Sequence, residues 1–351
     1  MSKNLTLLTG VPGWLGTRFL RVLVQGLPDV PAFARPDPDR RIRCLVLKGM
    51  PRDSLVTISP RIEIVEGDVR NPESLREFFR DAEGATVFHL IGIIHPKRVR
   101  EFYEINVEGT RNVLKGATGA GCRRIVSISS NSPAGCNPRH DHLFTEKSPY
   151  NPYMNYGQSK KLMEDLLLEA SRSHGIETVI LRPCWFYGPE QPPRQTRFFK
   201  MIKAGKAPIV AGGECRRSMS YVDNTCQGLL LAEKSDASRG GVYWIADERP
   251  YTMNEIVDTV ELLLERDFHM PVAHKRVRLP GFVSEAALAA DRLLQGLGLY
   301  NQEIHVLSEM NKTIACSVDL ARRELGYAPK ISLEEGMRRS IQWCLENGQQ
   351  I

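Results

Sequence analysis

Short apolar runs alternate with longer amphipathic stretches through the first half of the chain. The runs have the length of buried strands, and the stretches carry apolar residues at the spacing of helices that pack on a sheet. The predicted strands are Leu5–Thr9, Ile42–Leu47, Ile62–Glu66, Thr86–Leu90, Arg124–Ser129 and Thr178–Leu181. The predicted helices are Leu15–Leu27, Ser74–Arg80, Val107–Gly119 and Tyr156–His174. This alternation predicts an α/β fold with a parallel sheet and helices on both faces.

The pattern changes after Pro183, where turns rich in proline and glycine alternate with short helices. One later segment, Pro280–Tyr300, has helical periodicity. The apolar residues on one of its faces are Phe282, Val283, Ala286, Leu293 and Leu297. We interpret this stripe as core packing of a smaller second domain. Contact with a membrane surface or with a hydrophobic ligand is the alternative.

Composition limits the classes of function. The 351 residues carry a net charge of +6 without a long run of like charges, so we expect a mildly basic solvated surface and no nucleic-acid binding. The eight cysteines are scattered without a CxxC pair, which predicts reduced, buried thiols. No apolar stretch is long enough to span a bilayer, and no separate signal region precedes the first strand. The sequence therefore predicts a cytoplasmic protein without a membrane span.

A glycine-rich loop follows the first predicted strand and opens the first predicted helix. Its glycines, Gly10, Gly13 and Gly16, have the spacing GxxGxxG. Glycine lets the backbone turn tightly and approach a pyrophosphate, and a helix N-terminus offers free N–H groups and the positive end of its dipole. The place of the loop between strand and helix indicates a dinucleotide site, and a purely structural turn is the alternative.

Two residues near the ends of the second and third predicted strands are candidates for contacts with the nucleotide. The carboxylate of Asp68 is suited to accept hydrogen bonds from an adenine amino group, or alternatively to cap the helix that begins near Pro72. Lys48 stands where an acidic residue would bind the ribose 2′-hydroxyl, so it favours a 2′-phosphate, and NADP over NAD. A solvated loop lysine is the alternative for Lys48.

Tyr156 and Lys160 lie one helical turn apart in a predicted helix, which places both side chains on one face. A nearby ammonium favours the phenolate and is expected to lower the pKa of the phenol. Tyr156 is then suited to exchange a proton with an alcohol or ketone oxygen while hydride moves to or from a nicotinamide. Ser130 follows the strand Arg124–Ser129, where its hydroxyl would hold the substrate oxygen. A pair on a helix surface and an ordinary polar turn are the structural alternatives.

These motifs, in this order, resemble the extended short-chain dehydrogenases/reductases, also called the NAD-dependent epimerase/dehydratase family, over nearly the whole chain. The residues that carry the resemblance are Thr9–Gly16 (TGxxGxLG), Gly67–Val69, His89–Gly92, Asn106–Thr110 (NxxGT), Ser130, Tyr156, Lys160, Arg182–Pro183, Tyr187–Pro189, Tyr221–Asn224 and Leu325–Pro329. The resemblance implies a doubly wound Rossmann sheet with a smaller mixed C-terminal substrate lobe. Residues 1–182 and 214–250 are expected to form the NAD(P)-binding domain, and residues 183–213 and 251–351 the substrate lobe.

The resemblance also implies roles for individual residues. Tyr156 is the proton donor or acceptor, Lys160 lowers the pKa of Tyr156 and holds the nicotinamide ribose, and Ser130 orients the reacting oxygen. The implied cofactor-binding residues are Gly10, Gly13, Trp14, Leu15, Gly16, Lys48, Asp68, Val69, Leu90, Ile91, Gly92, Asn106, Ser129, Tyr156, Lys160 and Pro183. The implied substrate-binding residues are Ser130, Asn131, Trp185 and Arg217. A homodimer through the helices that begin near Asn106 and Tyr156 is expected.

Two branches of the family fit the remaining residues. Asn224 and Trp185 favour the branch similar to 3β-hydroxysteroid dehydrogenases, which oxidise or reduce a secondary alcohol or ketone on a hydrophobic molecule. Arg217 favours the nucleotide-sugar epimerases and reductases, where an arginine in this place binds the diphosphate. We expect the first branch, with the sugar branch as the alternative and a non-catalytic dinucleotide-binding scaffold as the second alternative. Asn131-Ser132 replaces the Asp-Glu pair of the sugar 4,6-dehydratases, which disfavours elimination of water.

The two histidines of His140-Asp141-His142 raise the question of a metal ion. No third cluster of ligand residues supports such a site. We therefore interpret this segment as a polar loop and expect no metal, with a metal-binding loop as the alternative.

Overall fold

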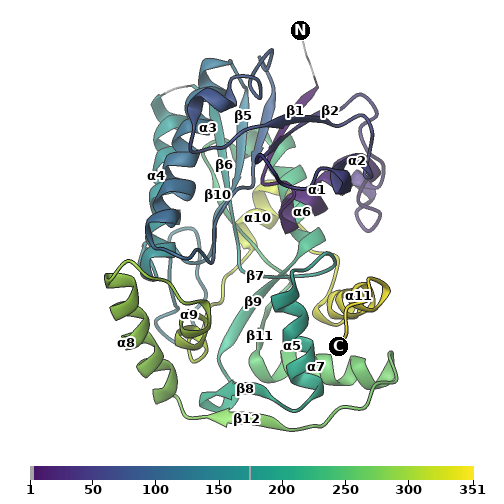
Figure 1. Cartoon of the computed structure of the whole chain (residues 1–351), viewed down its shortest axis with the longest axis vertical. Helices are drawn as coiled ribbons and strands as arrows, with labels where there is room; N and C mark the ends of the chain where they lie inside the picture. Colours follow the sequence, from purple (N-terminus) through teal and green to yellow (C-terminus); the bar gives the residue numbers. More distant parts are fainter. Residues whose placement is uncertain (1–3, 174) are drawn as a thin grey trace.

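The computed structural model describes residues 4–173 and 175–351. Within these residues, parallel strands form a seven-stranded central sheet in the order β10-β6-β5-β4-β1-β2-β3 (Figure 1). The strands are β1 (Leu5–Thr9), β2 (Arg41–Val46), β3 (Glu63–Glu66), β4 (Thr86–His89), β5 (Arg124–Ile128), β6 (Glu177–Pro183) and β10 (Val242–Ile245). The strand order reverses at β1, which lies between β2 and β4, and a ligand crevice is expected beyond the carboxyl ends of the strands at such a point. The predicted doubly wound parallel sheet is confirmed.

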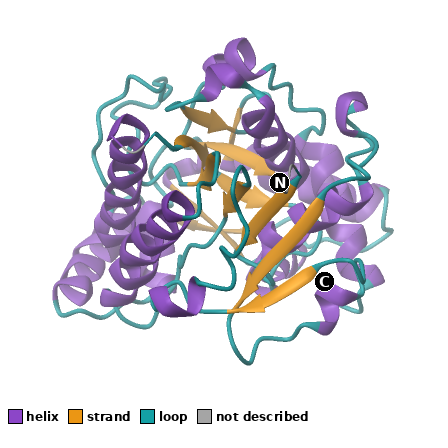
Figure 2. Cartoon of the chain, turned by 90° about the horizontal axis from the view of Figure 1, so that it is seen from above, coloured by secondary structure: helices purple, strands orange, loops and turns teal. Residues whose placement is uncertain are grey.

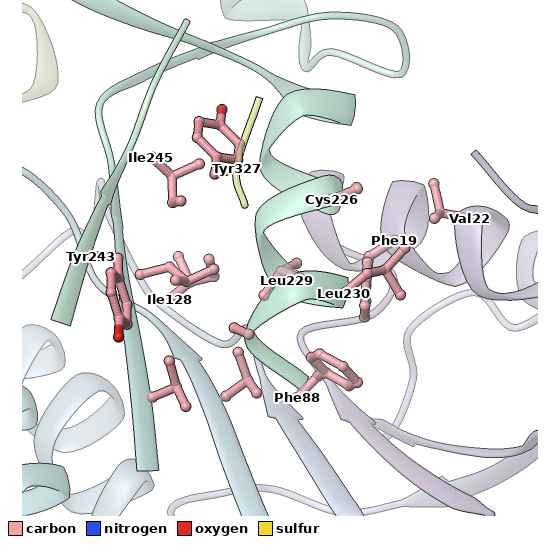
Figure 3. Packing of buried hydrophobic residues seen from close by; sticks show 14 of the residues in the cluster. Phe19, Val22, Phe88, Ile128, Cys226, Leu229, Leu230, Tyr243, Ile245 and Tyr327 are labelled. Carbon is pink, nitrogen blue, oxygen red and sulfur yellow. The ribbon is translucent and has the colours of Figure 1, made fainter. Parts of the chain in front are cut away.

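Helices cover both faces of this sheet (Figure 2). The helices on one face are α1 (Trp14–Gln25) and α6 (Val222–Lys234), and those on the other are α3 (Gly109–Gly119) and α4 (Met154–Ser173). Figure 3 shows the first core, where Phe19 of α1 and Leu229 of α6 are buried with strand residues. The second core contains Val113 of α3 and Met163 of α4. Burial on both faces explains why the strands read as continuous apolar runs.

Two of the predicted helices differ from those observed. Ser74–Arg80 contains only the end of a 3-10 turn, Pro72–Leu75, which starts early because Asn71 caps it and proline occupies its first position. The predicted helix Val107–Gly119 begins as a π-helix over Phe102–Glu108 before it continues as α3. Single π-helical turns are frequent at functional sites. The predicted end of the helix that begins near Tyr156, His174, lies outside the described residues.

After β6 the chain forms two small sheets beside the large one. The mixed three-stranded sheet has the order β11-β9-β7, and β12 pairs with β8 in the other sheet. The strands are β7 (Trp185–Tyr187), β8 (Ala207–Val210), β9 (Arg216–Tyr221), β11 (Pro250–Thr252) and β12 (Arg276–Leu279). The remaining helices are α2 (Asp53–Val56), α5 (Pro193–Lys203), α7 (Met253–Arg266), α8 (Phe282–Gly296), α9 (Gln302–Glu309), α10 (Asp319–Leu325) and α11 (Leu333–Glu346). In Figure 1 both small sheets lie below the large sheet.

The apolar stripe of α8 does not pack in a core, so our interpretation of this stripe was wrong. Phe282, Leu293 and Leu297 are 70%, 68% and 69% exposed. The buried face is the opposite one, formed by Ser284, Ala287, Leu288, Asp291 and Gln295. This face is inside although it carries Asp291 and Gln295, because both polar side chains find hydrogen-bond partners there.

The other predictions from composition concern the cysteines and the membrane. All eight cysteines are free, and all but the half-buried Cys136 are buried, which confirms the prediction of buried thiols. Among the described residues, no helix combines the length and the apolar character needed to cross a bilayer.

Candidate active site

The glycine loop packs closely against the backbone that follows β4. Gly10 has a φ of 90°, and a Cβ there would lie 2.7 Å from the carbonyl carbon of Leu90. A Cβ on Gly13 would lie 2.7 Å from the carbonyl oxygen of Gly10, and a Cβ on Gly16 would meet the same oxygen. The loop therefore needs glycine at all three positions. Gly13 precedes α1 and supplies no side-chain cap, so the N-terminus of α1 offers N–H donors to an anion. This cradle fits the pyrophosphate of a dinucleotide.

The start of α1 is also fastened to the substrate side of the molecule. The indole N–H of Trp14 donates to the carbonyl of Pro189 at 2.7 Å. One turn later, Arg18 makes a bidentate ion pair with Asp223 of α6, at 2.6 and 2.8 Å. Asp223 belongs to the segment Tyr221–Asn224, for which the sequence suggested no contact. These bonds fasten the start of α1 to the segment that follows β7 and to the start of α6.

The residues after β2 and β3 lie at the edge of the large sheet. Asp68 accepts hydrogen bonds from the backbone and the guanidinium of Arg70, and these bonds lower the pKa of its carboxyl group. The cap of the following turn is Asn71, so the alternative that Asp68 caps it was wrong. Lys48 is exposed in the turn after β2. Its side chain is therefore accessible to a phosphate group.

Tyr156 and Lys160 both lie on α4, as the spacing predicts. Tyr156 is half-buried, and burial raises its pKa to about 12, although a hydrogen bond from Ser130 acts in the opposite direction. The expected lowering of the Tyr156 pKa by Lys160 is therefore not observed. The ammonium of Lys160 instead donates to the carbonyl of Ile128 at 2.8 Å. A phenol in this state keeps its proton at neutral pH.

The side chain of Lys160 is buried. Burial lowers the pKa of its ammonium to about 8, and the carboxylate of Glu164 acts in the opposite direction. A Cβ built on Gly92 would lie 3.4 Å from Nζ of Lys160, within van der Waals contact of the ammonium. Lys160 thus lies beside the loop that follows β4.

Asn106 joins that loop to α4. Its side-chain oxygen accepts from the backbone N–H of Ile93 at 2.9 Å, and its amide donates to the carbonyl of Ile93 at 3.2 Å. The same amide donates to Ser159, the neighbour of Lys160, at 3.0 Å. Asn106 lies in the π-helical turn, which presents its side chain to both partners. It therefore positions the backbone around Lys160.

A buried histidine fixes the other side of this loop, and we assigned it no role from the sequence. The ring of His89 makes hydrogen bonds to the hydroxyls of Thr9 at 3.0 Å and Thr110 at 2.9 Å. Burial lowers the pKa of His89 to about 3, so the ring is neutral. Its two bonds tie the ends of β1 and β4 to α3. Two threonines were the available signal in the sequence. Thr9 directly precedes the glycine loop, and Thr110 ends the NxxGT motif.

The predicted residues around Ser130 lie together. The Ser130 hydroxyl contacts the hydroxyl of Ser132 at 3.3 Å and the side-chain oxygen of Asn131 at 3.4 Å. The hydroxyl of Ser129 is buried without a hydrogen-bond partner in the described part of the chain. Pro183 ends β6, next to β5 in the sheet. An orphaned hydroxyl at this strand end is suited to a ligand group.

The two predicted substrate residues after β6 make different kinds of contact. Trp185 packs its ring on Phe198 at 5.7 Å. Arg217 is only 8% exposed, and its guanidinium donates to the backbone carbonyl of Glu309. This hydrogen bond links Arg217 of β9 to the end of α9.

An aromatic and polar wall beside Tyr156 was missed from the sequence. The ring of Phe102 lies 5.7 Å from that of Tyr156, and the ring of Tyr300 lies 5.4 Å from Phe102. The hydroxyl of Tyr300 is 2.8 Å from Nδ1 of His95. The negative charge of Glu309 contributes to the raised pKa of Tyr156, so its carboxylate faces the same region.

The start of α4 is capped by a side chain from α8. The side-chain oxygen of Gln295 accepts from the backbone N–H of Asn155 at 3.2 Å and from its side-chain amide at 2.9 Å. Gln295 in turn donates to Asp291 at 3.0 Å, and Nδ1 of His305 is 2.7 Å from the same carboxylate. Asn155 is the residue before Tyr156. The α8–α9 segment therefore helps to position the helix that carries Tyr156.

Comparisons with known proteins agree with this geometry. The sequence profile of the NAD dependent epimerase/dehydratase family matches residues 6–246. The chain is 52% identical, over 99% of its length, to the uncharacterized protein y4nL of Sinorhizobium fredii, of which it covers 97%. It is 26% identical, over 94% of its length, to a 2-alkyl-3-oxoalkanoate reductase of Shewanella oneidensis, of which it covers 84%.

A solved structure shows the same fold. The chain resembles DesIV, a dTDP-glucose 4,6-dehydratase from Streptomyces venezuelae with NAD bound, at a TM-score of 0.73 and 25% identity. The match covers 98% of this chain and 97% of that one. The profile match extends over more than half of the sequence and includes the glycine loop and the Tyr156 helix. The chain is therefore an oxidoreductase of the NAD-dependent epimerase/dehydratase family.

Proposed function

We propose that this enzyme transfers hydride between a nicotinamide dinucleotide and a secondary alcohol or ketone carbon of a hydrophobic substrate. The observation that carries the proposal is the aromatic wall beside Tyr156, where the half-buried Tyr300 offers apolar ring surface and the fully buried ring of Phe102 contacts both tyrosines. Such surface favours a substrate with apolar groups. The name of the Shewanella relative, a 2-alkyl-3-oxoalkanoate reductase, joins a ketone to an alkyl group and supports the same substrate class.

The cofactor would be held by the residues at the carboxyl ends of β1, β2 and β5. The glycine loop and the N-terminus of α1 would bind the pyrophosphate, and the free hydroxyl of Ser129 would bind a further polar group. We infer a preference for NADP because the exposed Lys48 offers positive charge where a carboxylate would select NAD. When bound, the dinucleotide supplies or accepts the hydride.

Tyr156 would handle the proton. Because its pKa is about 12, the phenol carries its proton at neutral pH and is suited to donate it to the oxygen of a ketone. Ser130 would orient that oxygen, since its hydroxyl is near enough to the Tyr156 phenol to affect its pKa. Lys160 would place a positive charge beside the cofactor loop, near Gly92. We therefore propose that Tyr156 donates the proton when the enzyme reduces a ketone.

The nucleotide-sugar branch is the second candidate, and Arg217 is the residue that favours it. Its guanidinium is mostly buried and engaged with the Glu309 carbonyl. A diphosphate would have to compete with that bond. We further propose that α3 and α4 form a homodimer interface, and that the chain divides into the cofactor domain and substrate lobe defined above.

A substrate panel tests the proposed function. Oxidation of NADPH and NADH is measured with hydrophobic ketones, among them a 2-alkyl-3-oxoalkanoate and a 3-ketosteroid. Conversion of UDP- and dTDP-sugars is followed by chromatography of the sugar products, because an epimerase returns the hydride to its substrate and consumes no NADPH or NADH. We expect turnover of a hydrophobic ketone and none of the sugars, and Arg217→Met is expected to keep that turnover. Turnover of a nucleotide sugar that Arg217→Met abolishes would assign the sugar branch. Dinucleotide binding without any turnover would instead favour a non-catalytic scaffold.

A further inference from the structure

The exposed face of α8 carries an unbroken apolar row. Phe282, Leu293 and Leu297 are about 70% exposed, and the exposed small residues between them are Ala286, Ala289 and Ala290. Steps of three and four residues place all of these side chains on one face, here called the α8 stripe. In Figure 1, α8 lies at the outer edge of the molecule, beyond α9. The fold does not use this face, because the opposite face of α8 packs inward.

The apolar surface continues from α8 onto a neighbouring loop. The backbone N–H of Val99 donates to the carbonyl of Gly298 at 3.0 Å, and Arg98 forms an isolated bridge with Leu299. Leu299 is 46% exposed, and Ile94 on the same loop is 39% exposed. The 94–100 loop therefore lies next to the C-terminal end of the stripe.

Positive charge surrounds this apolar surface. Lys97, Arg98 and Arg100 are exposed on the 94–100 loop, Arg292 is exposed on α8, and Arg278 is exposed just before it. Cationic side chains beside an amphipathic helix attract anionic lipid headgroups.

The neighbouring acidic groups do not cancel this charge. Glu285 is paired with Lys312, and Glu104 lies 3.8 Å from Arg100. Glu101 binds a backbone N–H of the loop. The basic residues outnumber these carboxylates, so the surface has an excess of positive charge.

The apolar surface ends next to the candidate active site. Its residues at positions 94 and 299 are each followed in sequence by a member of the aromatic wall, His95 and Tyr300, which lie 2.8 Å apart. Tyr300 contacts Phe102, and Phe102 contacts Tyr156. A surface that contacts this end of α8 would thus be separated from the phenol of Tyr156 by only two or three side chains.

We propose that the α8 stripe and the 94–100 loop dock this enzyme on an anionic lipid surface, from which its hydrophobic substrate is taken. The part that concerns the substrate rests on the proposed function. A helix of 15 residues is roughly 22 Å long and 10 Å wide, so the stripe offers roughly 200 Å². A stable protein interface needs about 800 Å² on each side. A second copy would also bring like charges together, whereas an anionic bilayer neutralises them.

Vesicle co-sedimentation tests the docking surface. The whole enzyme is mixed at low salt with vesicles of phosphatidylcholine alone, or of phosphatidylcholine with phosphatidylglycerol. We expect binding to the anionic vesicles, and we expect Leu293→Ser/Leu297→Ser to weaken it by at least about tenfold, because two large apolar groups are lost. Leu262→Ser is the matched control, since Leu262 is 48% exposed on α7, and it is expected to bind like the unchanged protein.

A second pair of variants tests the charge. Lys97→Glu/Arg98→Glu is expected to abolish the preference for anionic vesicles, and Arg239→Glu, at an exposed site on another part of the chain, is expected to retain it. Failure of the unchanged protein to bind anionic vesicles would overturn the proposal, as would binding that survives Leu293→Ser/Leu297→Ser.

Oligomeric state and activity separate the remaining outcomes. A dimer that dissociates in Leu293→Ser/Leu297→Ser, measured by light scattering, would assign the stripe to a second copy and overturn the lipid proposal. Vesicle binding does not require turnover. An enzyme that reduces hydrophobic ketones without binding vesicles refutes only the docking, and a protein that binds vesicles without reducing any ketone refutes only the proposed function.

Discussion

The buried ammonium of Lys160 should reduce the stability of the fold. Burial lowers its pKa from 10.5 to about 8, a difference of about 2.5. Because one unit of pKa corresponds to about 1.4 kcal/mol, keeping Lys160 charged at neutral pH costs about 3 kcal/mol. Methionine has a similar length and no charge, but it gives up the hydrogen bond to the Ile128 carbonyl, worth about 1 kcal/mol. We expect Lys160→Met to raise the free energy of unfolding by about 2 kcal/mol and to abolish turnover.

The stability gained in Lys160→Met depends on pH. Between pH 8 and pH 10.5 the unfolded chain binds the Lys160 proton and the folded chain does not, so this group makes the unchanged protein more stable as pH rises. The variant lacks this contribution, and its advantage must shrink over that window.

Urea unfolding followed by tryptophan fluorescence, at pH 7 and at about pH 10, measures both effects. Lys161→Met is the matched control, because Lys161 is the next residue and its side chain is 31% exposed. We expect its stability to change by no more than about 0.5 kcal/mol, with no such pH dependence. A Lys160→Met protein that is less stable than the unchanged protein at pH 7, or a gain that is independent of pH, would refute the reasoning.

Three further substitutions test the cofactor site and the cap on α4. Gly16→Ala places a Cβ against the carbonyl of Gly10, so we expect dinucleotide affinity by calorimetry to fall at least about tenfold, or about 1.4 kcal/mol; unchanged affinity would contradict the role of the loop. Gln295→Leu removes the acceptor for Asn155, and we expect kcat to fall about tenfold at unchanged dinucleotide affinity. An unchanged kcat would exclude a role of this cap in turnover. Lys48→Glu is expected to shift the ratio of kcat/KM values from NADP toward NAD by at least about tenfold, and an unchanged ratio would remove the proposed role of Lys48.

Local sequence patterns were sufficient for the sheet and the glycine loop. Strand periodicity and the spacing of Gly10, Gly13 and Gly16 depend on residues that are neighbours in sequence, and the structure places these elements within a few residues of the prediction. The aromatic wall could not be found this way. Tyr300 contacts Phe102 only because of the path that the chain takes after β12. The local sequence pattern of neither segment indicates this contact.

The α8 stripe shows a second limit of sequence patterns. Helical periodicity separates two faces but does not say which one packs inward. Here the inner face carries Asp291 and Gln295, whose burial is stable only because His305 and Asn155 supply partners from other elements. A pattern that counts apolar residues alone assigns the wrong face.

A correct prediction of the Tyr156 pKa also required knowledge of contacts between residues distant in sequence. The spacing to Lys160 fixed the helix face, but the ammonium turns to the carbonyl of Ile128 on β5. Burial then dominates and raises the pKa of the phenol. The proposed proton-donor role of Tyr156 is compatible with this correction, because a phenol with a high pKa is protonated at neutral pH.

The most direct test of the account replaces Tyr156 with phenylalanine and measures hydride transfer and dinucleotide affinity on the same protein. We expect kcat for ketone reduction to fall by about a thousandfold, because the proton donor is lost, while the affinity for NADP stays within about twofold, since the glycine loop is untouched. A Tyr156→Phe protein that reduces the ketone at a rate close to that of the unchanged enzyme would contradict the account.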